Sequence, residues 1–212
     1  MSEDTIAIRR GLPDGSREEA AVLLDEAFGV NLNMSLPHGD KRLAFLARAF
    51  ATDRTVVALR GRELVGMVGL SASEGRYRGG LMDVTWDPRP FHDLLGVMGS
   101  IRAVVGLVAA AHKPERGELY VDGIAVSAQA RGQGIGTRLL GEVASIARED
   151  GFRWVRLDVV DINPRAQALY ERVGYKVTRV QSFRYMRRFV GHGGMTSMEL
   201  AVGAASVGGE AG

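Results

Sequence analysis

A glycine-rich segment in the second half of the chain has the residue types and spacing of an anion-binding turn. Its sequence is Arg131-Gly132-Gln133-Gly134-Ile135-Gly136-Thr137, between a strand-like segment and an amphipathic helix-like segment. Glycines let successive backbone N–H groups point at one spot, and the helix that follows adds its unpaired amides and the positive end of its dipole. The segment predicts a pyrophosphate site, where Arg131 can add a charge-assisted hydrogen bond. A tight strand-to-helix connection without a ligand is the alternative interpretation.

Two common phosphate-binding motifs do not fit this turn. A P-loop requires Gly-Lys-Ser/Thr after its spacer, and the turn contains no Lys. The dinucleotide fingerprint G-x-G-x-x-G is one residue longer than Gly132-x-Gly134-x-Gly136, although Asp158 stands near the position of a ribose-binding acid. Several strand-like segments also precede the turn, whereas a Rossmann fold places it after the first strand. The pattern therefore favours neither a P-loop nor a Rossmann domain.

A tyrosine and two carboxylates are side chains that could move protons. Tyr170 lies on the apolar face of a predicted helix that Asn163 caps, a position that on its own is typical of a core aromatic. Glu118 and Asp122 lie two residues on either side of Tyr120, on one face of a predicted strand. Each carboxylate could be solvated at a strand edge, paired with a cation, or used as a base.

The glycine turn and a second motif together resemble the GNAT superfamily of acyl-CoA-dependent N-acetyltransferases. The residues from Arg131 to Gly136 match the R/Q-x-x-G-x-G/A signature of that family. Downstream, a segment is similar to the family's N-x-x-A-x-x-L-Y-x-x-x-G-F/Y element, and it reads Asn163-x-x-Ala166-x-x-Leu169-Tyr170-Glu171-x-x-Gly174-Tyr175. One predicted helix and one predicted strand separate the two motifs, as in the family. The resemblance is close over residues 118–180 and loose over residues 5–70.

The resemblance implies that acetyl-CoA binds in a gap between two strands. Backbone groups of Ile124, Ala125 and Val126 would bond the pantetheine arm and polarise the thioester carbonyl. The amides from Gln133 to Thr137 would hold the pyrophosphate. The implied cofactor-binding residues are Ile124, Ala125, Val126, Arg131, Gly132, Gln133, Gly134, Ile135, Gly136, Thr137, Asn163 and Tyr170.

The same resemblance implies direct transfer of the acetyl group to a primary amine of a small molecule, peptide or protein. It places Tyr170 at the general-acid position, where the phenol would protonate the leaving thiolate. It places Glu118 where histone-acetylating members carry a base, whereas Asp122 lies nearer the expected thioester, and ordered water is the third candidate. The chain has no Cys, which excludes a cysteinyl intermediate. The alternative function is a catalytically inactive acyl-CoA sensor or interaction module.

The elements that must position these residues follow from hydrophobic periodicity and turn signals. Predicted strands cover residues 5–10, 55–59, 63–70, 118–126, 154–160, 176–180 and 196–202. Predicted helices run from Ser16 to Gly29, which is expected to close the helix, and over residues 41–50, 134–150 and 163–174. The resemblance implies an α/β (α+β) fold with a mixed, mostly antiparallel central sheet flanked by helices.

Residues 71–117 interrupt this pattern. They are expected to form a helical insertion between the third and fourth strands of a single domain, which covers residues 1–202. Within them, residues 94–111 are apolar and reach the lower limit for a membrane span, but Arg102 would be costly at a bilayer centre. A helix that packs on the body, on a second copy in a homodimer, or over a substrate pocket is expected instead. The Gly/Ala-rich residues 203–212 are expected to form a disordered tail.

The composition fits one globular domain without a metal or a nucleic-acid partner. The 212 residues are 46% apolar and 25% charged, and the net charge of +2 does not indicate nucleic-acid binding. The absence of Cys and the irregular spacing of the histidines give no metal site. The acidic start, Met1-Ser2-Glu3-Asp4, lacks an apolar signal segment, so a cytoplasmic location is expected.

Overall fold

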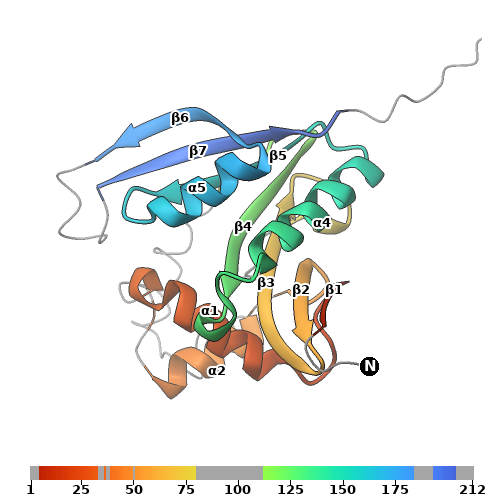
Figure 1. The fold of residues 1–212 in the computed structure, drawn as a ribbon, viewed down its shortest axis with the longest axis vertical. Coiled ribbons are helices and arrows are strands. Elements are labelled where there is room, and N and C mark those ends of the chain that lie inside the picture. Colours follow the sequence, from red (N-terminus) through yellow and green to blue (C-terminus); the bar gives the residue numbers. More distant parts are fainter. Residues whose placement is uncertain are drawn as a thin grey trace, which may run out of the picture.

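The computed structural model describes residues 5–32, 36, 39–49, 51–79, 112–183 and 193–203, which form one sheet with helices on both faces (Figure 1). The strands are β1 (Ile6–Arg10), β2 (Thr55–Arg60), β3 (Glu63–Ala72), β4 (Glu118–Val126), β5 (Trp154–Val160), β6 (Lys176–Ser182) and β7 (Gly194–Ala201). Their spatial order is β1-β2-β3-β4-β5-β7-β6, and only β4 and β5 run parallel among these neighbouring pairs. The expected mixed, mostly antiparallel sheet is confirmed.

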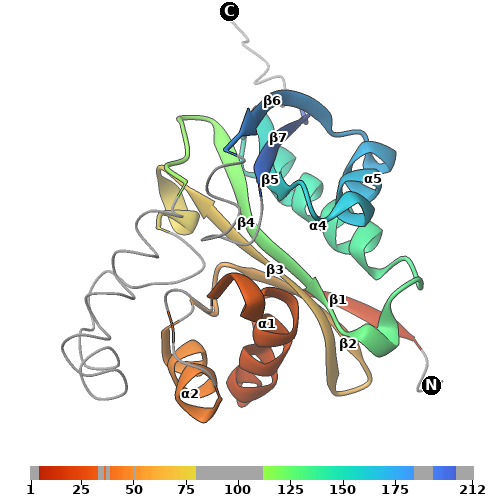
Figure 2. The ribbon, with the colours of Figure 1, turned by 90° about the vertical axis from the view of Figure 1, so that its left-hand side faces the viewer.

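The helices form two layers on this sheet. One layer consists of α1 (Arg17–Leu32) and α2 (Asp40–Ala49), and the other of α4 (Ile135–Glu149) and α5 (Pro164–Val173) (Figure 2). We call the corresponding sides of the sheet the α1 face and the α4 face. Short 3-10 turns at Gly75–Tyr77 and Ala128–Ala130 follow β3 and β4.

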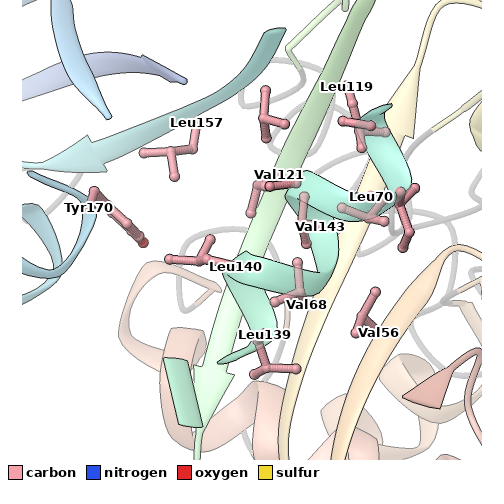
Figure 3. Packing of buried hydrophobic residues seen from close by; sticks show 14 of the residues in the cluster. Val56, Val68, Leu70, Leu119, Val121, Leu139, Leu140, Val143, Leu157 and Tyr170 are labelled. Atoms are coloured by element: carbon pink, nitrogen blue, oxygen red, sulfur yellow. The ribbon is translucent and has the colours of Figure 1, made fainter. Parts of the chain in front are cut away.

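The apolar stripe of α4 anchors this helix over the centre of the sheet. Leu139, Leu140 and Val143 are fully buried in the same cluster as Val68 of β3 and Val121 of β4 (Figure 3). Burying a leucine or valine side chain contributes roughly 1.5–3 kcal/mol. The start of α4, which carries the glycine turn, is therefore held firmly against β3 and β4.

Helix α1 continues beyond Gly29, so the prediction that this glycine ends the helix is wrong. Arg42 of α2 donates from Nη1 to the carbonyl oxygen of Gly29 at 3.3 Å, and its Nε lies 2.6 Å from Oδ1 of Asp25. A Cβ at position 29 would lie only 2.8 Å from that carboxylate oxygen. Gly29 is thus a position of close contact between α1 and α2.

Most of the predicted insertion lies outside the described residues, including residues 94–111 with Arg102. Residues 204–212 of the expected tail lie outside them as well. In the described part of residues 71–117, β3 extends to Ala72 and residues 112–117 lead into β4. No helix in the described ranges combines the length and the apolar character that crossing a bilayer requires.

Strands β4 and β5 separate along their length. Their parallel register joins only residues 118–121 of β4 to residues 154–157 of β5, although the strands continue to Val126 and Val160. On its other side, β4 stays paired with β3 as far as Val126, with Asp122 as the extra residue of a bulge. Beyond residue 121, β4 therefore has no β5 partner for its backbone hydrogen-bonding groups.

Candidate functional site

A cavity of about 780 Å³ lies beside the part of β4 that β5 leaves unpaired. Its wall comes from α1, β4, the glycine turn, the first turn of α4, and α5. The lining residues are Glu26, Ala27, Phe28, Ile124, Ala125, Val126, Ala130, Arg131, Gly132, Gly134, Ile135, Gly136, Thr137, Asn163, Arg165, Ala166, Leu169, Tyr170 and Arg172. Every residue predicted to bind the cofactor lines this cavity except Gln133.

The glycine turn presents the N-terminus of α4 to the cavity. Gly132 and Gly134 have φ angles of 80° and 74°, which residues with a Cβ rarely adopt. The amide of Arg138 donates to the carbonyl of Gly134 at 3.1 Å, so the amides of residues 135–137 precede the first bond of the helix. Unpaired amides and the positive end of a helix dipole at the cavity wall have the geometry and the charge that suit an anion.

The two polar side chains of the turn point to different surroundings. Arg131 donates from Nε to the carbonyl of Val126 at 3.1 Å and from Nη2 to Glu26 at 3.2 Å, which ties the turn to β4 and α1. Gln133 accepts from Arg60 at 2.7 Å and donates to the carbonyl of Gln129 at 3.3 Å. The side chain of Gln133 is thus engaged outside the cavity lining, which leaves only its backbone for the predicted role.

Tyr170 lies at the cavity wall contributed by α5, and its side chain is only 5% exposed. Asn163 begins this helix as predicted, because its Oδ1 accepts a hydrogen bond from the amide of Ala166 at 3.2 Å. Burial raises the pKa of Tyr170 to about 12. A phenol with this pKa stays protonated at neutral pH, as a proton donor must.

Glu118 lies away from the cavity, in a network of ions. Its side chain is fully buried, with Oε1 2.7 Å from His112 Nε2. Its Oε2 accepts from Arg156 at 3.1 Å and from the amide of Glu115 at 3.2 Å. This geometry is the ion-pair arrangement that the sequence left open for Glu118.

Asp122 occupies the bulge where β4 starts to leave β5. Its Oδ1 accepts a hydrogen bond from Ser71 at 2.8 Å, and Ser71 is the register partner of Tyr120 in β3. The predicted common face of Tyr120 and Asp122 is therefore present. Asp122 is two residues from the cavity-lining Ile124, whereas Glu118 is six residues away from it.

Sequence reasoning missed the part of the wall that α1 supplies and two cations on α5. Glu26 accepts a hydrogen bond at 2.9 Å from the amide of Ala128, which is 102 positions later in the chain, and no local pattern could reveal this contact. Arg165 and Arg172 also line the cavity, and their place on the same short helix as Tyr170 was a usable signal. Together with Arg131, they place three positive charges in the lining against the single negative charge of Glu26.

Comparisons with known proteins find similarity to acetyltransferases. Residues 94–175 match the acetyltransferase (GNAT) family profile. The chain is 40% identical over 80 residues to the probable N-acetyltransferase camello of Xenopus laevis, covering 37% of this chain and 36% of that protein. It is 41% identical over 56 residues to the thialysine N-epsilon-acetyltransferase of Bos taurus, covering 26% and 33%. The chain thus spans about a third of the length of these curated relatives.

The fold also matches a solved structure. The ribosomal-protein-S18-alanine N-acetyltransferase from Escherichia coli aligns with a TM-score of 0.57 at 15% identity, over 96% of this chain and 98% of that one. The GNAT fold expected from the two sequence motifs is confirmed.

Proposed function

We propose that this chain, whose residues 94–175 belong to the acetyltransferase (GNAT) family, is an N-acetyltransferase that moves an acetyl group from acetyl-CoA directly to a primary amine. The observation that supports this most is that one cavity joins the glycine turn, the unpaired end of β4 and the phenol of Tyr170. An extended thioester with a phosphate-rich end and a reactive sulfur end requires these three features together.

In this proposal the pyrophosphate of acetyl-CoA lies at the amides that begin α4. The pantetheine arm takes the place that β5 leaves beside residues 124–126, because backbone groups without a strand partner are available to the amides of the arm. Arg165 and Arg172 add positive charge for the remaining phosphate. The thioester then lies near the point where β4 and β5 separate.

The transfer needs a neutral amine, a polarised carbonyl and a protonated leaving group. An alkylamine with a pKa of about 10 is mostly charged at neutral pH, so it must lose a proton before its nitrogen attacks the thioester carbon. Backbone amides of β4 directed at the carbonyl oxygen stabilise the oxyanion. As the C–S bond breaks, the hydroxyl of Tyr170 protonates the sulfur, and the second proton lost by the nitrogen returns to the phenol through solvent.

For the base, we place Asp122 ahead of Glu118. Neither carboxylate is in the cavity lining, but Glu118 is fully buried, is held by three donors and lies six residues from Ile124, whereas Asp122 lies two residues from it. Asp122 lies in the bulge beside the expected thioester, where it can accept the proton of the ammonium directly or through ordered water.

The test is release of CoA from acetyl-CoA in the presence of single amines. A suitable panel contains thialysine, lysine, spermidine, kanamycin and a peptide with a free N-terminal alanine. We expect turnover with at least one amine and one acetylated product per CoA released. Tight acetyl-CoA binding without turnover on a broad panel would support the sensor alternative, and absence of acetyl-CoA binding would contradict both functions.

A further inference from the structure

The wall that α1 contributes to the cavity contains one aromatic ring, that of Phe28. Phe28 is half-buried, so part of its surface packs against the protein while it also borders the cavity. Two residues earlier, Glu26 contacts the amide of Ala128 and the guanidinium of Arg131. Helix α1 thus touches the glycine turn through Glu26 and β4 through Phe28.

The ring of Phe28 lies directly on β4 at Gly123. A Cβ built at position 123 would be 2.8 Å from Cζ of Phe28, which requires one of the two groups to move, and 3.2 Å from Cε2, which is a tight contact. Gly123 follows the bulge at Asp122 and precedes Ile124, the first cavity-lining residue of β4. The glycine therefore allows the ring to sit against the strand at the end of the cavity where β4 and β5 meet.

We propose that Phe28, seated on Gly123, limits the length of the acyl group and so selects acetyl-CoA over longer acyl-CoA thioesters. This inference rests on the proposed function, which places the pantetheine arm along residues 124–126 and the thioester beyond them. An acyl chain that continues from the thioester meets the Phe28 ring. The ring leaves room for a methyl group, whereas each additional methylene must displace it.

The first variant is Phe28→Ala, which removes the ring and lengthens the cavity at this end. A hydrophobic pocket discriminates one methylene by roughly 10- to 200-fold, so we expect the ratio of kcat/KM for butyryl-CoA to that for acetyl-CoA to rise at least ~10-fold. Phe28→Leu, which keeps most of the packing, should give a smaller rise in the same direction. If Phe28→Ala does not fold, the leucine variant still tests the direction.

The second variant, Gly123→Ala, tests the same contact from the side of β4. Its Cβ collides with the ring and must push it out of place, so we expect activity with acetyl-CoA to fall at least ~10-fold, in the range expected for a misplaced reaction centre. In the double variant Phe28→Ala with Gly123→Ala the collision is absent. Most of the acetyl-CoA activity should therefore return, as expected for two residues in direct contact.

The matched control is Phe152→Leu. Phe152 is a buried phenylalanine of the α4-face cluster, near Tyr77 and outside the cavity lining. Its replacement weakens packing in a similar way but should leave the ratio between butyryl-CoA and acetyl-CoA within threefold of wild type. A change in that ratio for Phe152→Leu would mean that general loosening of the fold, and not the Phe28 ring, alters acyl preference.

The measurements are CoA release with acetyl-, propionyl-, butyryl- and hexanoyl-CoA, and the dissociation constant of each thioester by calorimetry. If the wild type acetylates amines and folded Phe28→Ala keeps its acyl preference within threefold, the role of Phe28 is wrong while the proposed function stands. If the wild type binds acyl-CoA with a length preference that Phe28→Ala abolishes, but no amine is acetylated, the transfer function is wrong while the role of Phe28 stands. No length preference in either measurement overturns the role of Phe28.

Discussion

The hydroxyl of Tyr120 on β4 donates a hydrogen bond to Oδ2 of Asp158 on β5 at 3.0 Å, at the point where the two parallel strands separate. Asp158 is the first residue of β5 beyond the last residue paired with β4, and its buried Oδ1 has no hydrogen-bond partner among the described residues. Burial and the charge of Asp158 raise the pKa of Tyr120, so the phenol stays protonated and continues to donate. The pair joins β4 to β5 on the α1 face, just before the gap opens.

The first prediction concerns this pair. Tyr120→Phe should lower the free energy of unfolding by about 1–3 kcal/mol, because it leaves a part-buried carboxylate without its donor. Urea denaturation measures the change. In an Asp158→Ala background the same substitution should cost clearly less, and an equal cost in both backgrounds would show that the hydrogen bond contributes nothing.

The second prediction tests the glycine turn. Gly134→Asp should weaken binding of acetyl-CoA at least ~10-fold, because it brings a carboxylate and a strained backbone to the proposed pyrophosphate site. Gly151→Asp is the matched control, since Gly151 has a φ of 76° at the other end of α4 and open space around it. The control should lose comparable stability but keep its affinity in calorimetry. Equal affinities of the two folded variants would remove the turn from the binding site.

The third prediction concerns the proposed general acid. Tyr170→Phe should lower kcat by ~10²–10⁴-fold and change KM for acetyl-CoA by less than threefold, because the lost interaction forms only as the thiolate leaves. Tyr175→Phe is the control, since Tyr175 is a buried neighbour, 6.0 Å away between ring centroids, that does not line the cavity. A kcat within twofold of wild type for Tyr170→Phe would make Tyr170 a core residue only.

The fourth prediction follows from the pKa of Tyr170. Burial raises this pKa to about 12, above the value of about 10 in an unfolded chain, so the folded protein holds the phenol proton more tightly. The contribution of Tyr170 to stability is complete below pH ~10 and is lost as the pH rises towards ~12. The difference in tyrosinate absorbance between wild type and Tyr170→Phe should therefore titrate near pH 12. A midpoint near pH 10 would show that the phenol is solvated.

Local patterns in the sequence determined most of the elements and the glycine turn, and the family resemblance supplied the rest of the predicted cofactor site. The spacing of the glycines, the cap at Asn163 and the stop at Gly174 predicted the turn and helix α5, because each depends on residues only a few positions apart. The mixed, mostly antiparallel sheet was expected from the resemblance of two motifs to a family and not from periodicity, and its strand order came from the structure. The cofactor-binding prediction along residues 124–137 coincides with the cavity lining apart from Gln133.

Only the tertiary structure decided which polar residues face the cavity and which face each other. Glu118 and Asp122 were both candidate bases in the sequence, yet the first is enclosed by His112 and Arg156, and the second occupies a strand bulge. The contact of Phe28 with Gly123 and the hydrogen bond from Tyr120 to Asp158 join segments far apart in the chain. Periodicity reports which face of its own strand or helix a residue occupies, whereas these contacts depend on how separate elements align when the core packs.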